Sequence, residues 1–213
     1  MAVKVTQALK WQAWNKGLKP GQRDGFTPVQ VKRIRRILTD RGVSGLRDLA
    51  LFCVAIDTML QAPELLRLTV KDVRLRNSTM RSLLEVTRTR GKRPIRCALS
   101  KTTTDALEKW ITESDKKHED YLFPGRGTGS PRPMTARQVT RLLKSWVTEA
   151  GLDASKYGIE SLRRTKALHI LNGTGDLETV RVLLGHAKIE STANYLRIAR
   201  KSDPIAICRA FDI

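Results

Sequence analysis

The chain has 213 residues, of which 40 are lysine or arginine and 21 are aspartate or glutamate, so its formal net charge is +19. An apolar content of 40% is enough for the core of one domain with a short extension. The charge indicates a polyanionic partner, usually nucleic acid, with a merely soluble basic surface as the alternative. No apolar run is long enough to span a membrane, and the N-terminus lacks the pattern of a signal peptide.

The three cysteines, Cys53, Cys97 and Cys208, are odd in number and far apart in the sequence. Cys53 and Cys97 fall in apolar runs, where a thiol usually packs as a small hydrophobic side chain. This usage favours a reduced, cytosolic compartment and predicts no metal site.

The first 26 residues are predicted to form a basic arm ahead of the domain. Trp11 and Trp14 lie among lysines in this segment. One interpretation is an arm that contacts DNA or a neighbouring subunit, and the other is that both indoles pack on the domain.

A helix is predicted to begin at Pro28, because Thr27 and Gln30 form a capping box and proline suits the first helical position. Apolar residues at helical spacing give it one core-facing side, and Gly42 is expected to close it. The basic residues on its other sides would face either DNA or solvent.

The apolar run over residues 46–60 predicts a buried helix, and Pro63 can begin the next one. Alternating patterns over residues 82–87 and 94–99 predict two strands of a small antiparallel sheet. The connection between these strands is strongly basic, as expected for a hairpin that holds phosphates.

Two further helices are predicted from their capping residues. Ser100 caps the first, and Thr135 with Gln138 forms a second capping box, whose helix ends at Gly151. One face of this second helix offers three basic residues to DNA: Arg137, Arg141 and Lys144.

Residues 158–195 carry most of the functional information and predict three helices. The first ends in the glycine-rich turn over residues 173–175, and Asp176 caps the second. Gly185 is expected to end the second helix, and the third begins near Ser191.

Three reactive side chains lie in this stretch: Arg163, His186 and Tyr195. Arginine is a planar, bidentate donor to phosphate oxygens. A tyrosine hydroxyl is a possible nucleophile that forms a covalent phosphotyrosyl bond. Together with an imidazole, these groups suit chemistry on a phosphodiester.

Three motifs resemble the second conserved box of the tyrosine recombinases, the phage-integrase family: Leu162-Arg163-Arg164-Thr165, Leu183-Leu184-Gly185-His186 and Ser191-Thr192-Ala193-Asn194-Tyr195. The resemblance covers residues 27–200 and implies a mainly α catalytic domain with a small antiparallel β-sheet. Twenty-six residues are too few for the separate core-binding domain found upstream in many members, so a stand-alone catalytic domain is expected. The tail, residues 201–213, would dock on a neighbouring protomer or fold back on its own core.

The resemblance also implies a mechanism. Tyr195 would attack the scissile phosphate of double-stranded DNA and form a 3′-phosphotyrosyl link, which keeps the bond energy, so no cofactor, ATP or metal is needed. Arg163 would clamp the phosphate and His186 would hydrogen-bond to it. The family usually works as a tetramer on two duplexes, so a homo- or hetero-oligomer is expected, in the nucleoid of a bacterial cytoplasm.

Three positions depart from the family pattern. Gln61 stands where the first arginine is expected, which removes one cationic clamp. Glu160 stands in place of the histidine, where its carboxylate would repel phosphate unless it pairs with an arginine, or would act as a base. Arg90 stands at the lysine position, with Lys92 as a shifted alternative, and an arginine is a poor proton donor at neutral pH.

Four further basic residues are predicted to contact DNA through the hairpin loop and the second box: Arg88, Lys92, Arg93 and Arg164. His169 lies on the Arg163 helix but about 120° away from it around the axis, so a packed or surface histidine is expected rather than a substitute for the missing one.

Two functions remain open at this stage. The retained Arg163, His186 and Tyr195 favour a working or slow recombinase. The three substitutions favour a paralogue that binds DNA and neighbouring recombinases but cuts poorly. A basic nucleic-acid-binding protein without recombinase ancestry is a third class, and the spacing of the motifs argues against it.

Overall fold

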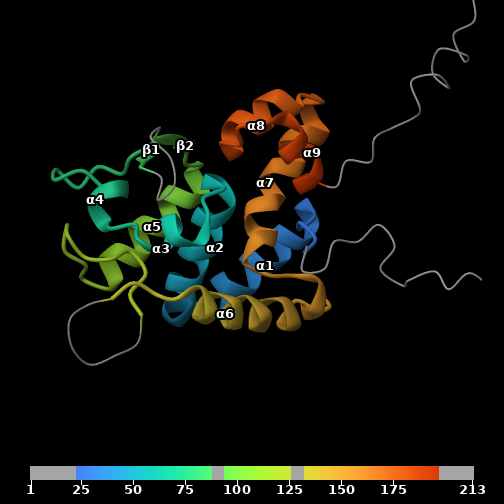
Figure 1. The fold of residues 1–213 in the computed structure, drawn as a ribbon. Helices are drawn as coiled ribbons and strands as arrows, with labels where there is room; N and C mark the ends of the chain where they lie inside the picture. Colours follow the sequence, from blue (N-terminus) through green and yellow to red (C-terminus); the bar gives the residue numbers. More distant parts are fainter. Residues whose placement is uncertain (1–22, 88–93, 126–131, 197–213) are drawn as a thin grey trace, which may run out of the picture.

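The structure, a computed structural model, describes residues 23–87, 94–125 and 132–196 (Figure 1). In these ranges the chain forms the following elements: α1 (Pro28–Asp40), η1 (Gly42–Gly45), α2 (Leu46–Thr58), α3 (Ala62–Leu66), α4 (Val70–Val73), β1 (Leu83–Val86), β2 (Ile95–Ala98), α5 (Lys101–Glu113), α6 (Ala136–Glu149), η2 (Ala154–Lys156), α7 (Ile159–Thr174), α8 (Leu177–Leu184) and α9 (Ile189–Leu196). The prediction of a mainly helical fold with a small antiparallel sheet is confirmed.

Helix α2 is the centre of the core. Every residue from Ala50 to Thr58 is buried, as expected for a helix that is apolar on all sides. It packs against α1, α5 and α7. The indole Nε1 of Trp146, on α6, donates a 3.0 Å hydrogen bond to Oδ2 of Asp48 at the start of α2. The predicted buried helix over residues 46–60 is therefore confirmed, two residues shorter.

Strands β1 and β2 pair antiparallel, with Leu83 opposite Ala98 and Val86 opposite Ile95. Leu84 is fully buried on the face that packs on the domain. Both predicted strands are confirmed to within one residue at each end. The end of α8 lies beside β2 (Figure 1), so the hairpin is a neighbour of the α7–α9 region.

The predicted caps are confirmed, because they depend only on local contacts. Thr27 and Thr135 form capping boxes with Gln30 and Gln138, and Ser100 caps α5. Asp176 Oδ1 accepts a 3.0 Å hydrogen bond from the Thr179 N–H at the start of α8.

One helix boundary was predicted wrongly. Helix α7 continues through Gly173 to Thr174, and only Gly175 adopts the left-handed conformation, at φ 69°. The Thr174 hydroxyl donates to the Ile170 carbonyl at 2.8 Å, which supports this last helical turn. Helix α9 begins at Ile189, two residues before Ser191, which agrees with the predicted start near that residue.

Residues 23–26, which precede the predicted start of the domain at residue 27, pack against its helices. We call them the N-terminal strap. Phe26 is 2% exposed, and its ring stacks on Tyr157 with centroids 4.4 Å apart. Its N–H donates to Thr165 Oγ1 at 2.9 Å, so the strap lies against α7. Residues 1–22 and 197–213 are outside the described residues, and so are both tryptophans of the arm and the C-terminal tail.

A partly buried ion pair and its hydrogen bonds link α2, α5 and α7. Asp57 is 6% exposed and receives the Lys166 ammonium at 2.9 Å on Oδ1. Its Oδ2 accepts the hydroxyl protons of Ser100 at 2.6 Å and Thr103 at 2.5 Å. Burial opposes ionisation of this carboxyl, but these hydrogen bonds outweigh burial and lower its pKa below the ordinary value.

Replacing Asp57 with alanine is expected to lower the free energy of unfolding by about 3 kcal/mol, because Lys166 and the two hydroxyls lose a buried acceptor. The exposed Lys101–Asp105 pair of α5 supplies the control, and Asp105→Ala should cost at most about 0.5 kcal/mol. The advantage of the wild type over Asp57→Ala should be complete above about pH 4 and shrink as the pH falls through the lowered pKa. Urea unfolding over a pH series measures this, and a constant difference would contradict it.

No helix in the ranges that the structure covers is long and apolar enough to cross a membrane.

Candidate active site

Four predicted site residues come together where α7, α8 and α9 meet (Figure 1). Glu160 and Arg163 lie on the first turns of α7, His186 follows the end of α8, and Tyr195 lies near the end of α9. The i, i+3 spacing of Glu160 and Arg163 places both on one face of α7.

Arg163 is 6% exposed and is held by two backbone carbonyls. Its Nε donates to the Met59 carbonyl and its Nη2 to the Leu184 carbonyl, both at 2.8 Å. Met59 has a left-handed backbone, at φ 50°, because it terminates α2. These bonds use two of the five guanidinium N–H groups and fix its plane, which prepares the remaining donors for an anion.

The Tyr195 hydroxyl donates a 3.2 Å hydrogen bond to Oε2 of Glu160. The Cζ atoms of Arg163 and Arg164 lie 5.4 Å and 4.8 Å from the centroid of the Tyr195 ring. Burial, and then the charge of Glu160, raise the pKa of the Tyr195 phenol well above its usual value, while the two guanidinium groups oppose this rise. The phenol is therefore protonated in this state, with its proton directed at a carboxylate.

His186 lies just past the end of α8, as predicted, because Gly185 adopts φ 63° and turns the chain. Its Nδ1 lies 3.0 Å from Oγ1 of the buried Thr192. Its ring meets the Tyr195 ring edge to face, with centroids 5.5 Å apart and planes at 81°. The imidazole and the phenol thus hold each other in a defined orientation.

Gln61 is exposed at the N-terminal cap of α3, two residues beyond Met59. Its backbone N–H donates to Oε2 of the buried Glu64 at 2.9 Å. Its side chain is neutral and lies on the surface, so it supplies no cation to the site.

The predicted DNA-binding residues fall into three groups. Arg88, Arg90, Lys92 and Arg93 lie outside the described residues. Arg137, Arg141 and Lys144 are exposed on α6. Arg164 does not fit its predicted role in this structure, because it is 3% exposed and its Nη1 donates to the carbonyl of Arg23 in the N-terminal strap.

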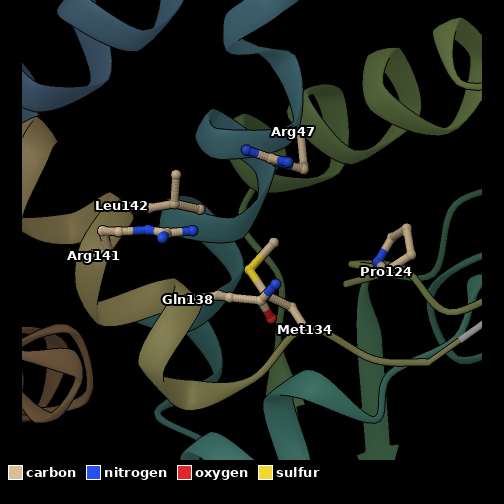
Figure 2. Close-up of a pocket in the computed structure, with 6 residues that line it drawn as sticks. All are labelled: Arg47, Pro124, Met134, Gln138, Arg141 and Leu142. Carbon is tan, nitrogen blue, oxygen red and sulfur yellow. The ribbon is translucent and has the colours of Figure 1, made fainter. Parts of the chain in front are cut away.

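A pocket beside α6 brings Arg141 together with Arg47, which was not predicted (Figure 2). Arg47 comes from α2, whereas Gln138, Arg141 and Leu142 come from α6. Arg47 also pairs with Asp48 at 2.7 Å. The sequence offered no signal for this neighbour, because the two arginines are far apart in the chain.

A second residue missed by the sequence pattern is Arg96, whose side chain is 71% exposed on β2. It lines a groove of ≈ 640 Å³ between β2 and the end of α8, together with Leu183 and His186. Arg96 also lines a smaller cavity of ≈ 180 Å³ with Met59 and Lys166. The alternation of Arg96 with the buried Cys97 was a usable signal for an outward-facing cation.

In the part of the chain that the structure covers, no three histidine, cysteine or acidic side chains are grouped to hold a metal ion. His169 is half-buried, and its Nε2 lies 2.9 Å from the carbonyl of Phe26. It packs against the strap, as predicted for a histidine without a catalytic role.

The sequence is similar to those of tyrosine recombinases over most of its length. It is 31% identical over 155 residues to the tyrosine recombinase XerC of Corynebacterium efficiens, which covers 72% of this chain and 47% of that protein. It is 28% identical over 192 residues to the tyrosine recombinase XerD of Listeria monocytogenes, which covers 85% of this chain and 61% of that protein. The chain thus spans 47% to 61% of the length of these two relatives.

Solved structures share the fold. The XerA recombinase superposes with a TM-score of 0.65 at 20% identity, covering 91% of this chain and 64% of that one. XerH bound to its difH substrate in a pre-cleavage complex gives 0.66 at 17% identity, covering 89% and 53%. The catalytic domain of the bacteriophage HP1 integrase gives 0.57 at 18% identity, covering 90% and 96%.

The sequence model of the phage integrase family matches residues 25–202 of this chain. These residues include all of α1 to α9 and the four clustered residues of the site. Since this match extends over more than half of the chain, the protein belongs to the phage integrase family.

Proposed function

We propose that this chain breaks and rejoins DNA strands through a covalent 3′-phosphotyrosyl intermediate on Tyr195. The observation that carries the proposal is the Tyr195 hydroxyl, 3.2 Å from Glu160 and packed beside the anchored Arg163. Membership of the family, the names of the relatives and the net charge of +19 support it.

The chemistry balances without an external energy source. Tyr195 Oη forms a bond to the scissile phosphorus as the bond to the 5′-oxygen breaks. The phenol proton passes to Glu160, and the departing 5′-oxygen takes a proton from solvent to become a 5′-hydroxyl. Arg163 stabilises the charge that builds on the non-bridging oxygens, and His186 donates a hydrogen bond to the phosphate. The phosphotyrosyl ester conserves the phosphodiester bond, so the free 5′-hydroxyl of a partner strand reverses the step.

The weak point of this site is protonation of the leaving 5′-oxygen. Arg90, at the position of the family's lysine, retains positive charge but is a poor acid at neutral pH. The loss of a cation at Gln61 removes a further stabilising group from the transition state. We therefore expect slow cleavage by the protein alone.

The proposal is tested with nicked suicide duplexes, which trap the intermediate because a short cleaved fragment diffuses away. The duplexes carry sites selected from randomised DNA by retention on the protein. A covalent band on a denaturing gel supports the proposal. Specific, salt-sensitive binding without any covalent band contradicts it.

A second function, a DNA-binding partner of another recombinase, is favoured by one specific observation. Glu160 accepts a hydrogen bond from the Tyr195 hydroxyl and, after burial, is the main cause of the raised pKa of Tyr195. The phenol is therefore held in its protonated form, which is the poorer nucleophile. Adding a related recombinase to the suicide duplex distinguishes the two functions. Binding that changes the partner's cleavage, with no adduct on this chain, supports the second.

The wider context follows from the proposed activity. We infer that residues 27–200 act as a catalytic domain on double-stranded DNA, with Arg137, Arg141 and Lys144 contacting the duplex. We propose that the protein acts on two duplexes as a homo- or hetero-tetramer, at the bacterial nucleoid where its DNA substrate lies. Mass measurement of the protein–DNA complex tests the tetramer.

Replacing Glu160 with glutamine is expected to slow formation of the covalent complex by about 10²-fold, because glutamine cannot accept the phenol proton. DNA affinity should rise slightly, since a negative charge near the phosphate is removed. Single-turnover rates on the suicide duplex measure this, with Glu149→Gln, an exposed residue of α6, as the charge-matched control. A faster reaction in Glu160→Gln would show that the carboxylate restrains Tyr195 and is not its base.

A further inference from the structure

Arg164, like Arg163, is a cation that is almost fully buried beside Tyr195. It is 3% exposed, and its Cζ lies 4.8 Å from the centroid of the Tyr195 ring, closer than that of Arg163. Burial of a guanidinium is costly unless partners compensate for the lost hydration. The face of an aromatic ring and a backbone carbonyl are two such partners.

The carbonyl that holds Arg164 belongs to the N-terminal strap. Arg164 Nη1 donates to the carbonyl oxygen of Arg23. The strap is itself fixed, because the Asp24 N–H donates to the Lys156 carbonyl at 3.0 Å and Phe26 is anchored on α7. A Cβ at Gly25 would come within 2.9 Å of Leu168, so the strap lies tightly on the helix. The acceptor for Arg164 is therefore held in place.

Four titratable or charged groups face the Tyr195 side chain: Glu160, Arg163 and Arg164 from α7, and His186 from the turn before α9. Arg163 is committed to the carbonyls of Met59 and Leu184 and, by the proposed function, to the phosphate. Arg164 differs, because its guanidinium lies 4.8 Å from the centroid of the Tyr195 ring and is anchored by the carbonyl of Arg23 in the strap. Its position suits a group that acts on the phenol.

We propose that Arg164 is a positioning residue for Tyr195. The N-terminal strap holds the Arg164 guanidinium against the phenol ring, so that Tyr195 Oη points at Glu160 and the negative charge that develops on Oη is stabilised. Its catalytic consequence rests on the proposed function. Its effect on the phenol is a property of the protein without DNA and is measurable by itself.

The experiment replaces Tyr195 by 3,5-difluorotyrosine in the 213-residue chain, since fluorination lowers the pKa of a phenol toward neutral pH. Absorbance titration of this residue is compared in four backgrounds: wild type, Arg164→Met, Arg164→Lys and Arg36→Met. Arg36 is an exposed arginine of α1, so its replacement removes the same charge away from the ring. Far-UV circular dichroism and duplex affinity report whether each variant is folded.

The expected result is that Arg164→Met raises the titration midpoint by about 0.5–1.5 pH units, because a partly desolvated cation over the ring favours the phenoxide. Arg164→Lys should restore much of this shift, and Arg36→Met should leave the midpoint unchanged. If Arg164→Met does not fold, Arg164→Gln serves the same comparison. A midpoint in the folded neutral variant that equals the wild type overturns the proposal.

A second readout links the effect to catalysis. On the suicide duplex, Arg164→Met should slow covalent complex formation by about 3- to 30-fold, which is the rate equivalent of that shift. The lower phenol pKa of difluorotyrosine should recover part of the loss, which a purely structural defect would not allow. Absence of any covalent complex in the wild type would defeat the proposed function alone, because the titration still decides the role of Arg164.

Discussion

Replacing Tyr195 with phenylalanine will abolish the covalent protein–DNA complex and leave duplex affinity unchanged. Only the hydroxyl is removed, so the ring keeps its contacts with Arg163, Arg164 and His186. In the proposed reaction the lost atom forms the bond to phosphorus, so no residual adduct is expected. Denaturing gels of the suicide-duplex reaction measure the adduct, and fluorescence anisotropy measures the affinity.

Tyr157→Phe is the matched control. Its hydroxyl is also bonded, accepting from Gln30 Nε2 at 3.1 Å, but its ring is buried and stacks on Phe26 rather than on a site residue. This variant should form adduct at the rate of the wild type. An adduct that persists in Tyr195→Phe would place the nucleophile on another residue and defeat the assignment of the site.

The second large expected effect is a gain in the rate of covalent complex formation. Replacing Gln61 with arginine will raise the rate of covalent complex formation by about 10²–10³-fold, the size of the loss when one oxyanion donor is removed from an enzyme. Gln61 is exposed two residues beyond Met59, whose carbonyl orients Arg163. A guanidinium there would add a second cation from the same turn of the chain, without disturbing a buried contact. Single-turnover kinetics with saturating protein measure the rate.

Added charge also tightens DNA binding without affecting chemistry, so the control adds an arginine elsewhere. Ser145→Arg, on the exposed side of α6, supplies the same charge far from the phosphate. It should strengthen duplex binding and leave the saturated cleavage rate unchanged. Equal rate gains in both variants, or no gain in Gln61→Arg with intact binding, would show that position 61 does not face the phosphate.

Local structure was predictable because its determinants are neighbours in sequence. The capping box of Thr27 and Gln30 joins residues three apart, and so does the cap that Asp176 provides to Thr179. The left-handed Gly185 ended α8 where it was expected, and this placed His186 correctly. The wrong boundary arose at Gly173, where the continuing i, i+4 hydrogen bonds of α7 outweighed the low helix propensity of glycine.

The composition of the site was also largely readable from sequence. Arg163, His186 and Tyr195 were singled out by their chemistry and by the resemblance to the family's second conserved box, and the structure brings these three together with Glu160. The question left open for Glu160 was whether it pairs with an arginine or acts as a base. The structure gives it the Tyr195 hydroxyl, a partner 35 residues away in the chain.

The sequence alone determined the helices and the hairpin, the basic character and the identity of the reactive side chains, because each depends on residue type or short-range spacing. Only the tertiary structure decided the partners of those side chains. Arg164 looked like a DNA contact but is buried between Tyr195 and the carbonyl of Arg23, 141 residues earlier in the chain. The physical reason is that burial and electrostatic partners depend on how distant elements pack, and no local pattern encodes that packing.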